Sequence, residues 1–147
     1  RLERATCFKA QIAAQDQGVG GGVFEAHDKQ PAALAEALRE LRHRAGARPA
    51  AVLCSNAVTT LRVATAVAQL GWQLGLDLGL VGFDETEWAP LVGPGLTTIA
   101  QPTDDLGRVA ASCLLERLQG RQLPPRQILL PGRLILRASS QRPSSRS

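Results

Sequence analysis

The chain has 147 residues, of which 44% are apolar and 20% charged, with a formal net charge of +4. These values are ordinary for one globular domain, and the basic residues are spread along the whole chain, which argues against a nucleic-acid interface. No run of 18 apolar residues predicts a membrane-spanning helix. The three cysteines are odd in number and lie in apolar segments, so we expect buried free thiols in a reducing compartment rather than a disulfide framework.

The first third of the chain predicts two helices with a short strand between them. Residues 2–17 place their apolar side chains on roughly one face, and the glycine-rich run 18–22 ends this helix. Residues 23–25 are short and strand-like. Residues 31–44 carry leucines at helical spacing, and this helix stops at Gly46.

The middle of the chain alternates apolar strands with a helix. Residues 51–54 are apolar throughout, as the strands of buried parallel sheets are. Ser55 or Asn56 can cap the helix that follows, which we expect to run to about Leu70. Residues 78–83 form the next expected strand.

The last part of the chain predicts a strand, a long helix and two closing strands, at residues 96–100, 103–120, 128–130 and 133–137. Thr103 is the expected N-cap of the long helix, whose first turn is acidic and whose last turn is basic, as the helix dipole favours. The Ser-, Arg- and Pro-rich segment 139–147 is expected to be a disordered tail.

This alternation of strands and helices predicts an α/β domain with a mainly parallel sheet flanked by helices. Ligands of such sheets bind outside the carboxyl ends of the strands. In this sequence those ends are residues 25–27, 55–56 and 84–88. We therefore expect a polar site where these three segments meet.

Polar recognition is the chemistry that these strand ends favour. Asp84 and Asn56 can each hold ligand hydroxyls with two hydrogen bonds, and Trp88 or Phe24 can offer an apolar face. The alternative is that Asp84 and Asn56 only cap helices. The residue types alone leave both interpretations open.

The sequence lacks the motifs that would indicate an enzyme, a cofactor or a metal. The glycine run 18–22 has no Gly-Lys-Ser/Thr ending and is a helix stop rather than a phosphate loop. His27 and His43 are isolated from each other, no Cys-x-x-Cys pair is present, and the carboxylates of residues 84–87 do not form a calcium loop. A Gly-x-Ser-x-Gly motif is also absent. We expect no enzyme activity, no cofactor and no metal.

Three segments carry a resemblance to a known family. They are Val81–Glu85 (Val-Gly-Phe-Asp-Glu), Leu96–Pro102 (Leu-Thr-Thr-Ile-Ala-Gln-Pro) and Leu130–Ser139 (Leu-Pro-Gly-Arg-Leu-Ile-Leu-Arg-Ala-Ser). Together with Arg4–Phe8, they resemble the C-terminal part of transcription regulators of the lactose/galactose-repressor family, over nearly the whole chain. The resemblance implies a type I, periplasmic-binding-protein-like effector domain behind a helix-turn-helix headpiece. In that family a small ligand, usually a sugar, binds between two lobes and changes operator affinity.

The resemblance also implies which residues bind the effector. The expected ligand site takes its members from the start of the chain and from the strand ends: Arg4, Phe24, His27, Asn56, Asp84, Trp88 and Gln101. Arg4, Asn56 and Asp84 match positions that contact ligand in the family, whereas Gln101 lies at a crossover between the lobes. The carboxylates before Trp88 are closest to regulators that respond to sugar acids, such as a ketogluconate.

By the same resemblance, residues 1–138 are the C-terminal lobe of the effector domain together with the crossover helix 103–120. The chain has no methionine and opens on Arg1, so we expect a fragment without the headpiece and most of the N-terminal lobe. The family implies a cytoplasmic homodimer that contacts operator DNA only through the headpiece and does not bind membranes. Its subunit contact is expected near residues 57–70 and 88–91.

A transport-associated, periplasmic sugar-binding receptor of the same fold is the alternative function. Such receptors are exported, and three unpaired cysteines disfavour an oxidising compartment. An upstream segment would separate the two, since a signal peptide indicates a receptor and a helix-turn-helix indicates a regulator.

Overall fold

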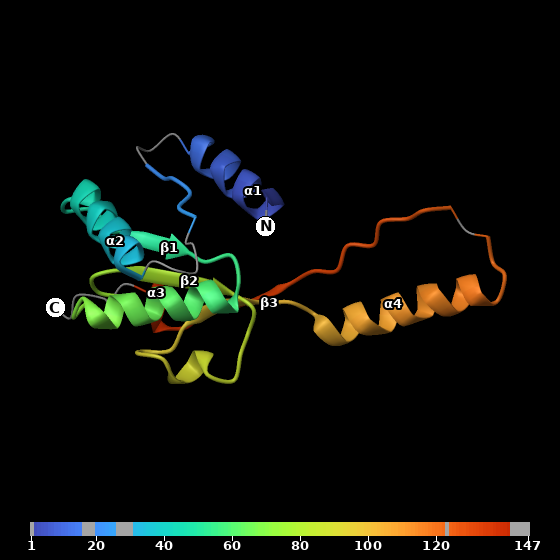
Figure 1. Ribbon diagram of the computed structural model, residues 1–147. Helices are drawn as coiled ribbons and strands as arrows, with labels where there is room; N and C mark the ends of the chain where they lie inside the picture. Colours follow the sequence, from blue (N-terminus) through green and yellow to red (C-terminus); the bar gives the residue numbers. More distant parts are fainter. Residues whose placement is uncertain (1, 16–19, 26–30, 123, 142–147) are drawn as a thin grey trace.

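The computed structural model describes residues 2–15, 20–25, 31–122 and 124–141. Its elements follow one another in the order α1 (Leu2–Ala13), α2 (Pro31–Ala45), β1 (Ala51–Leu53), α3 (Ala57–Gln69), β2 (Gly79–Phe83), η1 (Ala89–Leu91), β3 (Thr97–Ala100), α4 (Thr103–Leu118), β4 (Arg133–Ile135) and η2 (Ala138–Ser140). Figure 1 shows a lobe built around the sheet, with α1 beside it and α4 extending away from it. The predicted α/β class is confirmed.

A four-stranded sheet forms the centre of the lobe, in the order β1-β2-β3-β4. Strands β1, β2 and β3 are parallel, and β4 pairs antiparallel with β3. Leu53 stands opposite Val81, and Phe83 stands opposite Ile99, so the carboxyl ends of the three parallel strands lie at one edge. The prediction of a mainly parallel sheet is confirmed, and this edge is where such sheets bind ligands.

Helix α3 packs on the sheet so closely that it leaves no room for a side chain at one position. A Cβ atom on Gly82, within β2, would lie 2.7 Å from the hydroxyl oxygen of Thr60, so glycine alone fits there. Around this contact, α2, α3 and the sheet region contribute small and branched apolar side chains. The main buried ones are Leu34, Leu38, Cys54, Val63, Val67, Leu78, Leu80 and Leu96.

The prediction that all three cysteines are buried is wrong for two of them. Cys54, just after β1, is buried, and burial raises the pKa of its thiol to about 12, so the thiol stays protonated. Cys7 is exposed on α1 and Cys113 is partly exposed on α4. The apolar neighbours of these two residues along the chain do not enclose them, because neither helix is covered by the lobe.

Two predicted strands are not found in the described residues. Val23 and Phe24 are 43% and 53% exposed in a segment without strand structure. Residues 128–130 lie on the chain that returns from α4, also outside any strand. Both segments are strand-like in composition, but a strand forms only where a neighbouring strand and a packed face support it. Thr103 is also not the N-cap of α4, because that position belongs to Pro102.

Ser139, which was expected to begin a disordered tail, belongs to the lobe instead. Ser139 is fully buried, and its Oγ accepts a hydrogen bond from the Thr97 amide at 2.8 Å and donates one to the Leu80 carbonyl at 2.7 Å. A short hydroxyl side chain can thus satisfy buried backbone groups that an apolar residue would leave unpaired. Residues 138–140 therefore belong to the lobe, and residues 142–147 lie outside the described part of the chain.

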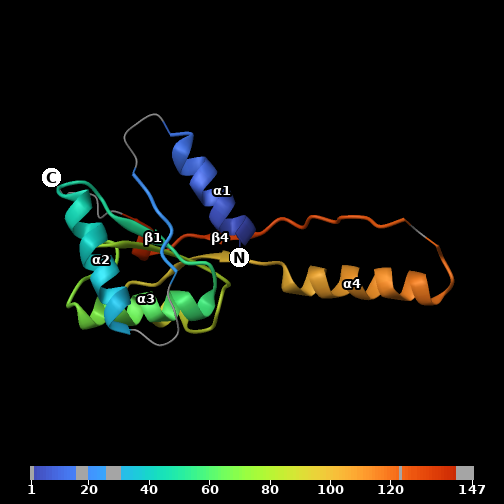
Figure 2. The same ribbon diagram turned by 45° about the horizontal axis from the view of Figure 1, so that its top comes forward.

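Helix α4 and the chain that returns from it form an arm, residues 103–122 and 124–132, that projects from the lobe (Figures 1 and 2). The two legs of the arm meet at Arg126, which donates to Glu116 at 2.7 Å and to the Cys113 sulfur at 3.2 Å. Helix α4 has no buried residue. Its apolar stripe faces solvent, and its most exposed large side chains are Leu106, Leu114, Leu115 and Leu118.

Candidate functional site

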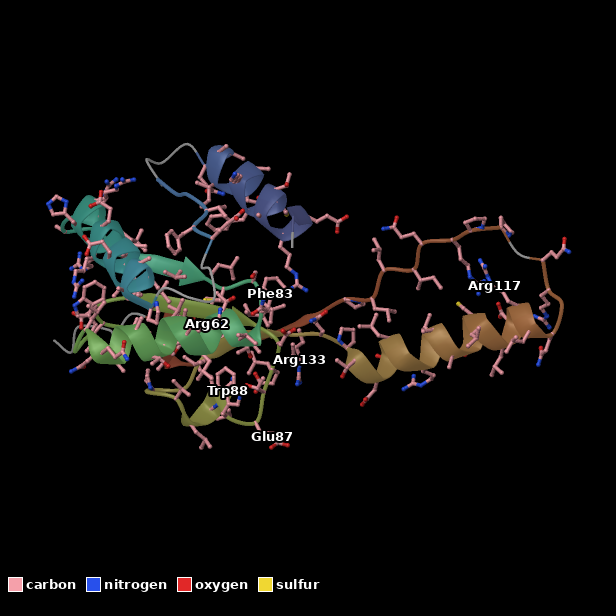
Figure 3. The ribbon with its side chains drawn as sticks, in the orientation of Figure 1. Arg62, Phe83, Glu87, Trp88, Arg117 and Arg133 are labelled. Carbon is pink, nitrogen blue, oxygen red and sulfur yellow. The ribbon has the colours of Figure 1, made fainter. Side chains whose placement is uncertain are left out.

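Polar groups from four distant parts of the sequence meet at the carboxyl edge of the parallel strands. Asn56 follows β1, Asp84 follows β2 and Gln101 follows β3. Arg4 reaches the same edge from α1. Figure 3 shows Phe83, Trp88 and Arg133 at this end of the lobe, from which α4 departs. Of the three predicted strand ends, those after β1 and β2 meet here together with Gln101, whereas residues 23–25 form no strand and residues 26–27 lie outside the described part of the chain.

Asp84 lies at the centre of this edge. Its Oδ2 accepts a hydrogen bond from the Ala57 amide at 3.2 Å, and its Oδ1 accepts one from the Gln101 side-chain amide. Its backbone φ is +74°, the one positive value at a non-glycine residue within the described ranges. Such a conformation is strained and is found mostly where tertiary contacts impose it. The strain coincides with the predicted site.

Asn56 sits directly across from Asp84 at the start of α3. Its backbone is extended, and its side-chain oxygen accepts a hydrogen bond from the Thr59 amide at 2.8 Å. This is the N-cap arrangement, which satisfies an amide that the first turn of a helix leaves unpaired. The side-chain oxygen is thereby used, so the amide nitrogen of Asn56 is the group that can donate to a ligand.

Asp84 and Asn56 do cap a helix, as the alternative interpretation predicted. Both side chains accept hydrogen bonds from amides in the first turn of α3. A carboxylate has about four acceptor positions, and Asp84 uses two of them. Capping and ligand binding are therefore compatible. The positive end of the α3 dipole also stabilises the negative charge of Asp84 at this place. The role of the two residues in ligand binding stays a prediction.

Arg4 ties α1 to the strand edge in two ways. Its Nη1 donates to the Ser55 carbonyl at 2.5 Å, and its guanidinium lies over the ring of Phe83, 4.1 Å from the centroid. A cation held over an aromatic face keeps its remaining N–H groups free to point sideways. Phe83 was not predicted as a member of the site, although its position as an aromatic residue directly before Asp84 was the available signal in the sequence.

The aromatic residues predicted to shield the site differ in their burial. Trp88 is half-buried and packs against the hydrophobic core from the loop after β2 (Figure 3). Phe24 is 53% exposed and is not enclosed at this edge. His27 lies outside the described residues. The structure thus joins Arg4, Asn56, Asp84 and Gln101, and does not enclose an aromatic shield around them.

Glu85 and Arg137 form an ion pair beside Asp84 that was not predicted from the sequence. The Arg137 Nη2 lies 2.5 Å from the Glu85 Oε1, although 52 residues separate them. The hydrogen bond from Arg137 holds the pKa of Glu85 below its usual value, against the opposing effect of partial burial. Both partners lie in segments of the family resemblance, Glu85 in Val81–Glu85 and Arg137 in Leu130–Ser139, and this was the available sequence signal.

A cavity lies at the opposite end of α3 from this edge. It has a volume of about 740 Å³ and is lined mainly by apolar side chains, including Val67, Trp72, Leu74 and Val92. It offers few polar groups and contains none of the predicted site residues. Within the described ranges, no three His, Cys, Asp or Glu side chains gather as metal ligands would, and no helix could cross a membrane.

Residues 3–140 match the family described as periplasmic binding protein-like domain. The chain is 44% identical over 140 residues to the HTH-type transcriptional regulator PtxS of Pseudomonas plecoglossicida, covering 95% of this chain and 40% of that protein. The solved complex of the transcriptional regulator CelR with cellobiose is similar with a TM-score of 0.75 and 26% identity, over 95% of this chain and 42% of that one.

The lac repressor dimer bound to operator and the anti-inducer ONPF is also similar, with a TM-score of 0.61 and 32% identity, over 74% of this chain and 31% of that one. The chain thus spans 40% of the length of the PtxS relative. These relatives are transcriptional regulators, in agreement with the expectation that the chain is not an enzyme, and they do not support the transport-receptor alternative.

Proposed function

Because the chain belongs to the periplasmic binding protein-like family, as an effector domain of a lactose-repressor (LacI) type transcriptional regulator, we propose that its strand edge binds a sugar or sugar acid. Binding there changes the operator affinity of the complete regulator, which acts as a repressor. The effector is a small polyhydroxy compound, and a ketogluconate is the candidate that we would test first.

The observation that carries this proposal is the meeting of Arg4, Asn56, Asp84 and Gln101 at one edge. A carboxylate that has spare acceptor positions can hold two sugar hydroxyls, and hydrogen bonds to charged groups are the stronger ones. Arg4 offers a planar donor fork, which suits a carboxylate on the effector. The cellobiose complex of the similar regulator CelR supports a sugar ligand for this type of fold.

Arg4 gives the sugar-acid part of the proposal its own test. Thermal shift of the complete regulator is measured with 2-ketogluconate, gluconate and glucose, because a ligand of the native state raises the unfolding midpoint. We expect a sugar acid to raise it most. In Arg4→Gln the shift with the acid should fall towards that with glucose. No shift with any of the three in the wild-type protein would contradict the proposal.

The complete regulator is further proposed to be a cytoplasmic homodimer that contacts operator DNA through a headpiece outside this chain. The first turns of α3 and the segment around η1 expose apolar side chains, with Val58 60%, Leu61 46% and Leu91 81% exposed. Exposed apolar side chains of this size favour association. The printed description of the similar lac repressor as a dimer on operator supports the same state.

Sedimentation of the complete regulator separates this surface from the arm. Leu61→Asp places a charge on the proposed subunit contact, and Leu118→Asp places the same charge on the exposed stripe of α4. We expect Leu61→Asp to give monomers at micromolar concentration and Leu118→Asp to leave the dimer intact. A dimer that resists Leu61→Asp but dissociates with Leu118→Asp would move the contact to the arm.

A further inference from the structure

A clamp of three side chains holds the loop that carries Asp84. The guanidinium of Arg137 binds both carboxylate oxygens of Glu85, with Nη2 2.5 Å from Oε1 and Nη1 3.1 Å from Oε2. The hydroxyl of Thr98 donates to the same carboxylate. The Arg137 and Glu85 side chains are 20% and 28% exposed. Two-point pairing in a partly shielded place fixes geometry far better than a single surface contact.

Arg137 itself stands on a rigid base. Its Nη1 donates to the Leu96 carbonyl at 2.7 Å, and its backbone amide donates to the Thr97 hydroxyl at 2.8 Å. Gly95 makes room for its side chain, because a Cβ atom there would lie 3.0 Å from the Arg137 Cδ at a φ of +85°. The clamp is thus anchored to the start of β3 and does not rest on a flexible surface side chain.

The two adjacent carboxylates of this loop bind segments on either side of the arm and β4. Asp84 binds Gln101, which lies between β3 and α4. Glu85 binds Arg137, which lies between β4 and η2. The loop at the centre of the strand edge therefore contacts the segment from which the arm departs and the segment that follows β4.

We propose that the Glu85–Arg137 clamp is the positioning element of the strand-edge site, keeping Asp84 in its strained conformation against α3 and linking it to the segment that follows β4. The link to effector binding rests on the proposed function, whereas the positioning of Asp84 does not. Glu85 and Arg137 act through Asp84 and are not themselves ligand contacts.

Hydrogen exchange of two amides in one helix turn tests the positioning directly. The Ala57 amide donates to Asp84, and the Thr59 amide donates to Asn56. In Glu85→Gln and in Arg137→Gln, we expect exchange at Ala57 to rise by about tenfold and exchange at Thr59 to stay within about twofold. General destabilisation would raise both together. Equal changes at the two amides, or none, would overturn the proposal.

Two further variants serve as controls for the hydrogen-exchange experiment. Glu40→Gln removes the exposed Arg44–Glu40 pair on α2, which is 2.6 Å long, and should leave both amides unchanged. Arg137→Lys keeps the charge but cannot bind both oxygens of Glu85, so exchange at Ala57 should still rise. Full protection of Ala57 in Arg137→Lys would show that charge alone suffices and would contradict a geometric clamp.

Calorimetry with 2-ketogluconate then tests the link to the effector. We expect Glu85→Gln to weaken binding by about tenfold in the wild-type background and by less than about twofold when Asp84→Asn is already present, because both act through one group. Equal losses in the two backgrounds would overturn the link. If 2-ketogluconate does not bind the wild-type protein, the proposed function fails, while the exchange result still decides the positioning of Asp84.

Discussion

The lobe and the arm each contain a helix with an apolar stripe, but the stripe is buried in the lobe and exposed in the arm. Helix α3 and helix α4 are both amphipathic and of comparable length, yet α3 buries Val63 and Val67 whereas α4 buries nothing. The pairs within the arm are mostly local, such as Arg108–Asp105 at 2.9 Å. The lobe instead joins residues more than 40 positions apart. Helical periodicity therefore predicts a helix but not whether something covers it.

This contrast locates the stability of the chain in the lobe. Buried side chains stabilise the fold because their apolar surface leaves water and packs closely against its neighbours. The side chains of the arm do little of either, so they add little to the free energy of unfolding. The strand-edge site belongs to the lobe, and its member Gln101 lies in the segment from which the arm departs. The arm thus begins next to the site but contributes little to the stability of the lobe.

Matched leucine truncations give the largest expected difference between the two regions. Leu80 is 0% exposed in β2, and Leu80→Ala should lower the free energy of unfolding by about 2–5 kcal/mol. Leu118 is 74% exposed on α4, and Leu118→Ala should change it by less than about 0.5 kcal/mol. Urea unfolding followed by circular dichroism measures both. Similar losses for the two variants would show that α4 is packed in solution.

Gly75 in the lobe and Gly120 in the arm share a backbone conformation but differ in what surrounds them. Gly75 has a φ of +85°, and an added Cβ would lie 2.4 Å from the Ala138 carbonyl oxygen. Gly75→Ala should therefore cost about 2–4 kcal/mol, because η2 must move. Gly120 has a φ of +80° with nothing near it, so Gly120→Ala should cost only about 1 kcal/mol. Equal unfolding midpoints in urea would mean that η2 is not docked against Gly75.

A smaller effect is expected in the dependence of the free energy of unfolding on pH below neutrality. The pKa of Glu85 is lowered in the folded protein from an ordinary value of 4.5, mainly by Arg137 and with a contribution from Arg133. Its stabilisation is therefore complete above pH 4.5 and is lost as the pH falls through the lower folded value. Glu85→Gln should be less stable than wild type by about 1 kcal/mol at neutral pH, with the gap closing in acid. A gap that does not depend on pH would exclude the ion pair as its cause.

The sequence allowed the order of most elements and the edge of the sheet to be predicted, because both follow from local patterns. Asn56 and Asp84 stand directly after apolar runs, and that position alone puts them at the carboxyl ends of strands. The placement of Arg4 and Gln101 at the same edge came from the family resemblance. Their meeting in the structure agrees with it, while their contact with an effector stays a prediction.

The misses share a physical cause, which is that they depend on long-range contacts. The strand predicted at 128–130 failed because no neighbouring strand pairs with it. Ser139 was assigned to a tail by its polar surroundings in the sequence, and its burial depends on Thr97 and Leu80. The Glu85–Arg137 pair spans 52 residues and leaves no local pattern. Such contacts become visible only once the chain is folded.

The most direct test of the strand-edge site is the affinity of the complete regulator for 2-ketogluconate in Asp84→Asn, measured by calorimetry together with the unfolding midpoint. Asparagine keeps an acceptor for the Ala57 amide but loses the charge, so the midpoint should change little while affinity falls about tenfold to a hundredfold. Asp77→Asn is the matched control, because Asp77 accepts from the Gln73 amide at 2.7 Å, away from the strand edge, and should bind as the wild type does. Unchanged affinity with a lowered midpoint in Asp84→Asn would contradict the account, since Asp84 would then only cap α3.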